Sequence, residues 1–306
     1  MDSDHKGRLP NALIVGVSRS GTTSLHHYLA GHPEVFMSMP KELRFFSGQV
    51  FGYPGKGPGD ERELYVETLD EYQNIFAGSG EATIVGEASP ENLYWHREVI
   101  PRIRSLLGDV SIIIMLRHPA ERAYSAWQMR VREERETLSF EAALEQEGAR
   151  MQAGWSPGWR YAGFSFYAES VEDYLANFSK VYIGLYDDLT ANTAVEFRKV
   201  LAFLGVDTNW QPAHFHRLNV SGHVQVPGVN WFFIRRRNPL QMLVRGIGKA
   251  VLGERGWVDF RESLRSRTLT KTTIAPDTRR DLVQHFRPDV ERLQAIIGRD
   301  LPSWFS

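Results

Sequence analysis

The segment Ala12–Leu25 constrains the fold more than any other part of the chain. It consists of a short apolar run, a turn bounded by Gly16 and Gly21, and the start of a predicted helix. Such a turn binds phosphate, because its backbone N–H groups point inward and the helix N-terminus adds positive potential. The glycine spacing is that of a nucleoside-triphosphate P-loop, but Thr22 stands where that motif has lysine. The loop carries its cation at Arg19 instead, which suits a donor without a γ-phosphate.

A second short apolar run, Ser111–Leu116, is typical of a strand that is buried on both faces of a sheet. It ends in Arg117, and a predicted helix that carries Ser125 follows. Open α/β sheets bind their ligands at the carboxyl ends of the strands. A guanidinium and a hydroxyl at that edge suit a second, isolated phosphate group.

Strand and helix patterns alternate along the chain. Apolar runs predict strands at Ala12–Val17, Val35–Met37, Ile84–Gly86, Ser111–Leu116 and Val181–Leu185. Helical spacing predicts helices at Thr22–Ala30, Arg97–Leu107, Ala120–Arg135, Phe140–Ala153, Tyr167–Phe178 and Val195–Leu204. This alternation predicts an α/β, P-loop-like three-layer fold, with a central, mostly parallel sheet flanked by helices. We expect residues 1–306 to form one domain: a core at about 11–206, C-terminal helices at 276–304, and a basic, capping segment at 217–271.

The two phosphate motifs together resemble those of the PAPS-dependent sulfotransferases, in particular the carbohydrate and heparan-sulfate type and its bacterial relatives. The resemblance covers roughly residues 12–204 and 276–304. It implies that an arginine and a serine placed like Arg117 and Ser125 hold the 3′-phosphate of PAPS (3′-phosphoadenosine 5′-phosphosulfate). It also implies that the first loop holds the 5′-phosphosulfate, through Ser18, Arg19, Ser20, Gly21, Thr22 and Thr23.

The resemblance extends to the candidate catalytic residues. Lys41–Phe46 is similar to the family's K-E-x-x-F-F segment, which implies that Glu42 is the base. Glu87, in a segment similar to the family's next active-site strand, is a rival that would orient the acceptor or hold Arg19. His118 is a third candidate, because the other branch of sulfotransferases uses a histidine base. Arg19, where the family usually has lysine, is expected to stabilise the leaving oxygen.

Each of these residues also has a purely structural interpretation. Glu42 could form an ion pair with Lys41 or Arg44, and Ser125 could be a small residue that allows close helix packing. Arg122 lies three positions before Ser125, where it could assist phosphate binding or pair with a carboxylate.

The acceptor is the least determined part of the prediction. The resemblance favours a hydroxyl or amine of a carbohydrate or glycosylated metabolite. We expect the loops Gly48–Gly59 and Gly154–Tyr161 to line the acceptor site. The aromatic residues of the second loop could stack on a sugar, or they could pack the loop onto the core.

The segment 235–271 is basic and contains apolar residues at helical spacing. Three interpretations remain open: a solvated helix at the domain edge, a cap over the donor or acceptor, and a helix that contacts an anionic membrane. The arginines at 235–237 are candidates for closing over the donor.

Composition excludes several other functions. The net charge of −1 gives no field that favours nucleic acid. The chain has no cysteine, which excludes disulfides, thiolate zinc sites and cysteine nucleophiles. The histidines show no metal-ligand spacing, so we expect no metal cofactor. The polar N-terminus and the absence of an apolar span predict a cytoplasmic, bacterial enzyme. Two alternatives remain. One is a P-loop nucleotide kinase or phosphotransferase, which would have lysine in place of Thr22. The other is a non-catalytic nucleotide-binding protein.

Overall fold

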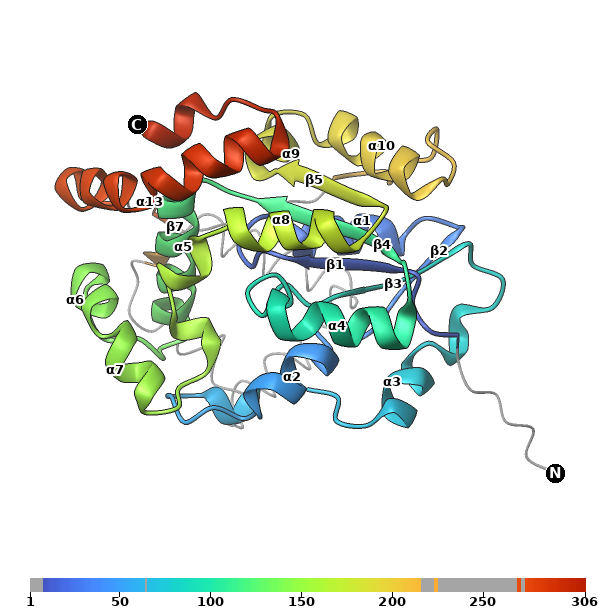
Figure 1. Cartoon of the computed structure of the whole chain (residues 1–306), viewed down its shortest axis with the longest axis horizontal. Helices are drawn as coiled ribbons and strands as arrows, with labels where there is room; N and C mark the ends of the chain where they lie inside the picture. Colours follow the sequence, from blue (N-terminus) through green and yellow to red (C-terminus); the bar gives the residue numbers. More distant parts are fainter. Residues whose placement is uncertain (1–7, 64, 216–222, 225–268, 271–272) are drawn as a thin grey trace, which may run out of the picture.

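The computed structural model describes residues 8–63, 65–215, 223–224, 269–270 and 273–306. Its centre is a five-stranded sheet in which every neighbouring pair of strands is parallel (Figure 1). The strand order is β2-β3-β1-β4-β5, with β1 at Ala12–Gly16, β2 at Val35–Met37, β3 at Ile84–Ala88, β4 at Ser111–Leu116 and β5 at Val181–Leu185. The predicted α/β class with a central parallel sheet is therefore confirmed.

Helices flank the sheet. They are α1 (Thr22–Ala30), α2 (Phe45–Phe51), α3 (Leu69–Ile75), α4 (His96–Leu107), α5 (Pro119–Arg132), α6 (Phe140–Glu145), α7 (Glu147–Gln152), α8 (Ala168–Asn177), α9 (Tyr186–Ala191), α10 (Thr193–Leu204) and α13 (Pro276–Ile297). Short 3₁₀ turns lie at Asp60–Arg62, Ala77–Ser79, Pro157–Trp159, Gly163–Ser165 and Pro302–Phe305. Two short strands, β6 (His223–Val224) and β7 (Leu269–Thr270), pair antiparallel apart from the main sheet.

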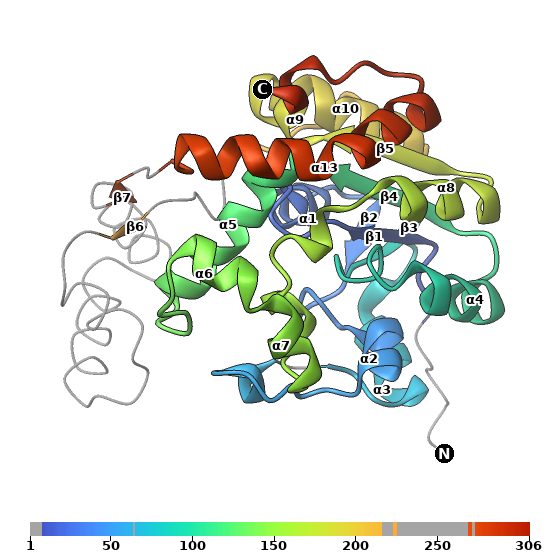
Figure 2. The same cartoon turned by 60° about the vertical axis from the view of Figure 1, so that its left-hand side comes forward.

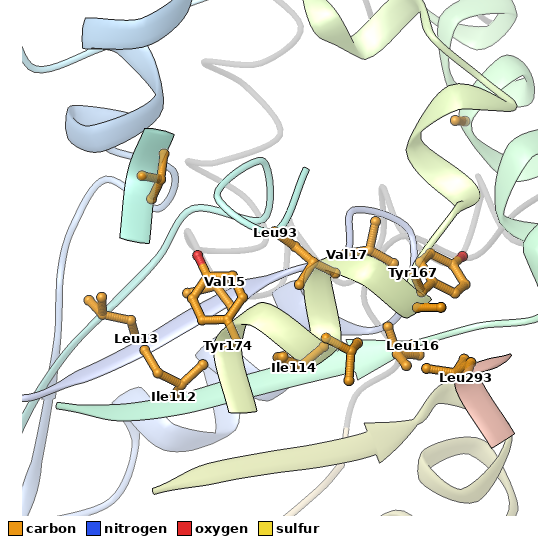
Figure 3. Packing of buried hydrophobic residues seen from close by; sticks show 14 of the residues in the cluster. Leu13, Val15, Val17, Leu93, Ile112, Ile114, Leu116, Tyr167, Tyr174 and Leu293 are labelled. Carbon is orange, nitrogen blue, oxygen red and sulfur yellow. The ribbon is translucent and has the colours of Figure 1, made fainter. Parts of the chain in front are cut away.

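The two faces of the sheet bury different residues because side chains alternate along each strand. Leu13 and Ile112 face the cluster that includes residues of α4, α5, α8 and α13 (Figure 3). Ile14 and Ile113, their neighbours in sequence, face the cluster formed with α1 and α10. The sheet is therefore the middle of three layers, and the loops at its carboxyl edge are held from both sides.

Helix α13 packs along α8 and α5 near the end of the chain (Figure 2). Its Asp289 accepts hydrogen bonds from the backbone N–H groups of Tyr167, at 2.7 Å, and Ala168, at 3.1 Å, where α8 begins. Trp304, just beyond α13, is fully buried. The C-terminal residues therefore complete the core of the domain.

Some elements differ from the sequence prediction. The helix predicted at Phe140–Ala153 is divided at Gln146 into α6 and α7. The predicted loop Gly48–Gly59 begins inside α2. The amphipathic helix, membrane contact and donor closure predicted for 235–271 fall on residues that, apart from 269–270, lie outside the described part of the chain. None of the helices that the structure describes is long and apolar enough to cross a membrane.

Candidate functional site

The glycine-bounded loop lies between β1 and α1, at the carboxyl end of the central strand of the sheet. Gly21 caps the N-terminus of α1 with φ +86°, a conformation that glycine adopts without steric cost. A Cβ atom at this position would lie 2.7 Å from Leu189 Cδ2. Ser20 is fully buried in the loop, and its hydroxyl makes no hydrogen bond with any described residue. An orphaned buried hydroxyl beside a helix N-terminus fits a phosphate or sulfate ligand.

Arg19 points from this loop toward α5. Its backbone is left-handed, with φ +73°, and its Nε donates a hydrogen bond to Ser125 Oγ at 3.0 Å. Arg117 donates from Nη1 to the backbone oxygen of Arg19 at 3.0 Å and stacks on the Tyr186 ring at 4.6 Å. The structure therefore brings together the loop cation and the two residues predicted to hold a separate phosphate.

The positive charges around the loop are crowded. Burial, together with the neighbouring Arg132 and Arg117, lowers the pKa of Arg19 to about 9. Arg122 is also buried, and burial lowers its pKa. Such a cluster of desolvated cations is stabilised when a ligand brings several negative charges to it.

Arg122 supports the loop from α5. Its Nε donates to Ser165 Oγ at 2.7 Å, and Nη1 lies 3.5 Å from Ser18 Oγ. Nη2 donates to the backbone oxygen of Tyr161. These hydrogen bonds go to hydroxyls and a carbonyl, so they favour the interpretation in which Arg122 assists the phosphate loop.

Glu42 lies on the turn that follows β2. Its backbone is left-handed, with φ +68°, and its N–H donates to the oxygen of Ala88 at the end of β3, at 3.0 Å. Its carboxylate pairs with Lys41 Nζ at 2.6 Å and with Arg44 Nη2 at 3.0 Å. Burial acts to raise the pKa of Glu42, but Lys41 and Arg44 outweigh it and lower the pKa to about 2. The predicted ion pairs are therefore present, and the carboxylate is ionised at neutral pH.

Arg44 connects Glu42 to a second carboxylate. Its Nε donates to Glu91 Oε1 at 3.0 Å, and its backbone N–H donates to Ser89 Oγ at 3.0 Å. Tyr53 donates its hydroxyl hydrogen to the other oxygen of Glu91. Burial raises the pKa of Glu91, and Arg44 opposes that effect. The sequence analysis missed Glu91 and Tyr53, because no motif marks them.

Glu87 and His118, the rival bases, lie in other surroundings. Glu87 is fully buried on β3, in register with Leu13, and faces the cluster under α4 and α8. The polar groups that act on its carboxylate are Tyr72 and Ser89, and Arg19 is not among them, so Glu87 does not hold Arg19. Burial raises the pKa of Glu87 to about 7. His118 is buried with its ring 6.2 Å from that of Trp304, and burial lowers its pKa.

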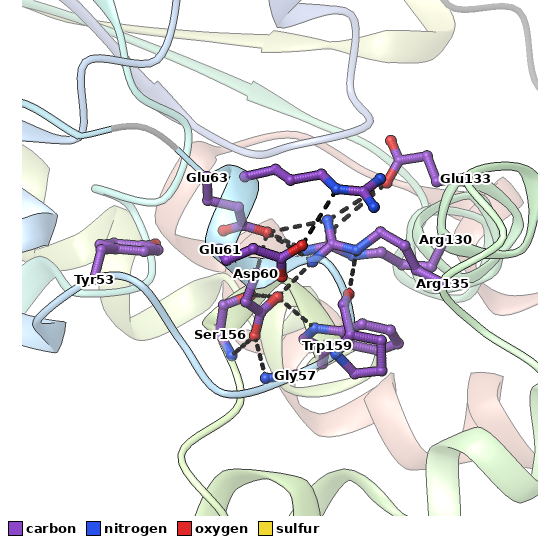
Figure 4. Close-up of polar contacts among 12 residues, drawn as sticks. Tyr53, Gly57, Asp60, Glu61, Glu63, Arg130, Glu133, Arg135, Ser156 and Trp159 are labelled. Atoms are coloured by element: carbon purple, nitrogen blue, oxygen red, sulfur yellow. Dashed lines mark hydrogen bonds and ion pairs between the residues drawn. The ribbon is translucent and has the colours of Figure 1, made fainter. Parts of the chain in front are cut away.

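A network around Asp60 joins the two loops that were expected to line the acceptor site (Figure 4). Asp60 is fully buried and accepts hydrogen bonds from the backbone of Gly57 at 2.8 Å, from Ser156 and from Trp159 Nε1 at 2.8 Å. Arg135 pairs with the same carboxylate. The buried positions of Trp159 and Tyr161 favour packing onto the core over stacking on a sugar. No sequence signal marked this network.

Among the described residues, no three histidine or carboxylate side chains lie close enough together to hold a metal ion. A parallel α/β sheet with a glycine-bounded loop at its central strand, flanked by Arg117 and Arg122, places the chain in the P-loop-like class of α/β folds.

The comparisons with known proteins identify the family within that class. The profile of the sulfotransferase family matches residues 10–212. The crystal structure of a sulfotransferase from Alicyclobacillus acidocaldarius is similar with a TM-score of 0.77 and 31% identity, over 98% of this chain and 100% of that chain. The chain therefore belongs to the sulfotransferase family.

Curated relatives include heparan sulfate sulfotransferases. The human bifunctional heparan sulfate N-deacetylase/N-sulfotransferase 2 is 35% identical over 122 residues, which are 40% of this chain and 13% of that protein. The mouse heparan sulfate glucosamine 3-O-sulfotransferase 3A1 is 25% identical over 296 residues, which are 96% of this chain and 64% of that protein. The chain thus spans less than two thirds of the length of either protein.

Proposed function

We propose that this protein transfers a sulfuryl group from PAPS to a hydroxyl or amine of a carbohydrate or glycosylated acceptor. The observation that carries the proposal is the meeting of Arg19, Arg117 and Ser125 beside the buried, unpartnered hydroxyl of Ser20. This arrangement offers two neighbouring sets of anion-binding groups, which suits a nucleotide with a phosphosulfate and a separate phosphate.

The donor, when bound, would supply an activated sulfuryl group whose transfer leaves adenosine 3′,5′-bisphosphate. In the proposed arrangement, Arg117 and Ser125 hold the 3′-phosphate. The loop Ser18–Thr23 donates N–H and hydroxyl hydrogens to the 5′-phosphosulfate. Arg19 stabilises the charge that develops on the departing 5′-phosphate oxygen, and no metal takes part.

Glu42 is the proposed base. The acceptor oxygen or nitrogen forms a bond to sulfur, the bond from sulfur to the 5′-phosphate oxygen breaks, and the acceptor proton passes to the Glu42 carboxylate. A carboxylate with a pKa of about 2 is ionised but weakly basic. An anionic donor that competes for Lys41 would raise the pKa of Glu42, and donor binding would then make this base stronger.

The carbohydrate acceptor is supported by the two heparan sulfate sulfotransferases described above, whose names state a polysaccharide substrate. The polar network of Asp60 supports it further, because the network fixes two loops next to the pairs formed by Glu42. Arg130 of the network pairs with Glu63 at 2.9 Å and also contributes to lowering the pKa of Glu42.

Calorimetric titration with adenosine 3′,5′-bisphosphate tests the donor site. We expect metal-free binding to the wild type that Arg117→Ala abolishes, and weaker binding of ATP with magnesium. Arg280→Ala, which removes an exposed arginine on α13, is the matched control and should bind as the wild type does. A preference for ATP with magnesium would overturn the proposal in favour of phosphoryl transfer.

A further inference from the structure

His26 is a buried, ionisable residue of α1 to which the proposed transfer assigns no role. The residue is 5% exposed, and its ring Nε2 lies 3.0 Å from the backbone oxygen of Ser38. Because a carbonyl oxygen can only accept, Nε2 carries a hydrogen and donates it. Burial lowers the pKa of His26 to about 4, so the ring is neutral at physiological pH and its one N–H group is the one bound to Ser38.

The carbonyl that His26 binds belongs to the turn after β2, which carries the candidate base Glu42. Strand β3 holds this turn at two points. The N–H of Ser38 donates to the oxygen of Gly86 at 2.9 Å, and the N–H of Glu42 donates to the oxygen of Ala88 at 3.0 Å. His26 holds the turn from a different element, α1. The turn is therefore tied both to the sheet and to the helix beside it.

The charged side chains of this turn also act on the His26 ring. Besides burial, Lys41 and His27 lower the pKa of His26, and Glu42 raises it. The ring therefore lies close to the ion pair of Lys41 and Glu42 and stays neutral beside it. A neutral N–H group can hold the backbone of the turn, whereas a cation at this place would repel Lys41 and compete for the Glu42 carboxylate.

Helix α1 begins at the proposed donor loop. Thr22 is its first residue, and His26 follows four positions later, so the two residues lie on one face of the helix, one turn apart. An anion bound by the loop would restrain the N-terminal turn of α1. Because the helix is a rigid element, this restraint extends to His26 and, through its hydrogen bond, to the turn that carries Glu42.

We propose that His26 is a positioning residue that couples the donor loop to the candidate base: through Ser38 it holds the turn so that Glu42 faces the acceptor when the donor is bound. This inference rests on the proposed sulfuryl transfer and adds a link between the two halves of its site. A base that is fixed before the acceptor arrives reduces the entropic cost of aligning the reacting groups.

Hydrogen exchange of the Glu42 backbone N–H measures the opening of the turn without any acceptor, because this group donates to Ala88 when the turn is closed. The probe is adenosine 3′,5′-bisphosphate at saturation, and exchange is followed by NMR. We expect the bisphosphate to slow the exchange about three- to tenfold in the wild type, the range that one neutral hydrogen bond can supply, and less than about twofold in His26→Leu. Equal slowing in both proteins, or none in the wild type, would overturn the proposal.

Two further variants separate positioning from general stability. His26→Gln keeps an N–H donor near the position of Nε2, and we expect it to restore the slowing; a glutamine variant that responds like His26→Leu would contradict the role of the donated hydrogen. His32→Leu is the matched control, because His32 is also buried and its Nε2 lies 3.0 Å from the backbone oxygen of Asp207, beyond the other end of α1. This control should keep the wild-type response. The same loss of response in both leucine variants would overturn the proposal.

A measurement on the wild type keeps the proposal testable if His26→Leu does not fold. The Nε2–H resonance of His26, identified by its loss in His26→Gln, should shift when the bisphosphate binds, and an unchanged resonance would contradict the coupling. Calorimetry on the same samples separates the possible failures. A bisphosphate that does not bind to the wild type contradicts the proposed function itself, whereas normal binding without either response contradicts only the role of His26.

Discussion

Glu42 combines a strained backbone with a strongly stabilised carboxylate. Its left-handed backbone, with φ +68°, is held by the hydrogen bond to Ala88, although such a conformation is strained for a residue with a side chain. Lys41 and Arg44 stabilise its ionised form so strongly that its pKa falls to about 2. A strained backbone and a strongly paired carboxylate in one residue are typical of a residue whose position matters for function.

We expect Glu42→Gln to lower kcat about 10²- to 10⁴-fold, because the amide cannot accept the acceptor proton. Bisphosphate affinity should not fall, because the substitution leaves Lys41 free to bind the anion. Steady-state kinetics with a sulfated product readout, together with calorimetry, measure both. Glu61→Gln, an exposed carboxylate paired with Arg62, is the control. Unchanged turnover in Glu42→Gln would leave Glu42 with its ion-pair role alone.

The sequence predicted that the loop of Arg19 and the strand end at Arg117 lie at one edge of the sheet, because strand ends in a parallel sheet converge there. The hydrogen bonds that join Arg19 to Arg117 and Ser125 are seen only in the structure. It could not predict the surroundings of Glu87. Successive residues of a strand point to opposite faces, so the side on which Glu87 lies depends on the register between β3 and β1.

At the scale of elements, the buried strands were the most predictable part. Val35–Met37, Ser111–Leu116 and Val181–Leu185 have the predicted bounds, because short apolar runs between turn residues have few other uses in an α/β protein. Helix α2 was missed because Phe45–Phe51 contains Gly48 and no clear amphipathic period. The division between α6 and α7 was missed because Gln146 is itself a good helix former.

The turn into α1 requires a glycine at position 21. Gly21→Ala places a Cβ atom 2.7 Å from Leu189 Cδ2 in a backbone with φ +86°. We expect bisphosphate affinity to fall about tenfold or more, because the phosphate loop must move, and stability to fall by about 1–3 kcal/mol. Calorimetry and urea unfolding measure these changes.

Gly205→Ala is the control for that experiment. Gly205 ends α10 with φ +75°, and no atom lies within 4 Å of the added Cβ. The control should lose stability through backbone strain alone and should retain its bisphosphate affinity. Equal affinity losses in both variants would show that the effect is one of general stability and not of the loop.

At the scale of the whole molecule, Glu87 is a carboxyl group inside the core between the sheet and its helices. Burial raises its pKa from about 4.5 to about 7, so the folded state binds its proton more tightly than the unfolded state. Such a group lowers the free energy of unfolding as the pH rises from about 4.5 to 7. Above pH 7 the carboxyl is ionised in the folded protein too, and the free energy of unfolding falls no further on its account.

We therefore expect Glu87→Gln to be more stable than the wild type by up to about 3 kcal/mol at pH 8, and to differ little from it at pH 5. Urea unfolding at the two pH values measures the difference between the proteins. Glu61→Gln, on the surface, should show no such pH-dependent difference. A difference that is the same at both pH values would contradict the raised pKa.

The hydrogen bonds between Asp289 and the start of α8 can form only late in the synthesis of the chain. The last strand of the main sheet ends at Leu185, and the family profile ends at residue 212. More than seventy further residues must be synthesised before Asp289 can leave the ribosome. Until then, the N–H groups of Tyr167 and Ala168 lack the partner that the folded protein gives them. The nascent chain can thus assemble its sheet early, but it completes its native packing only after Asp289 has emerged from the ribosome.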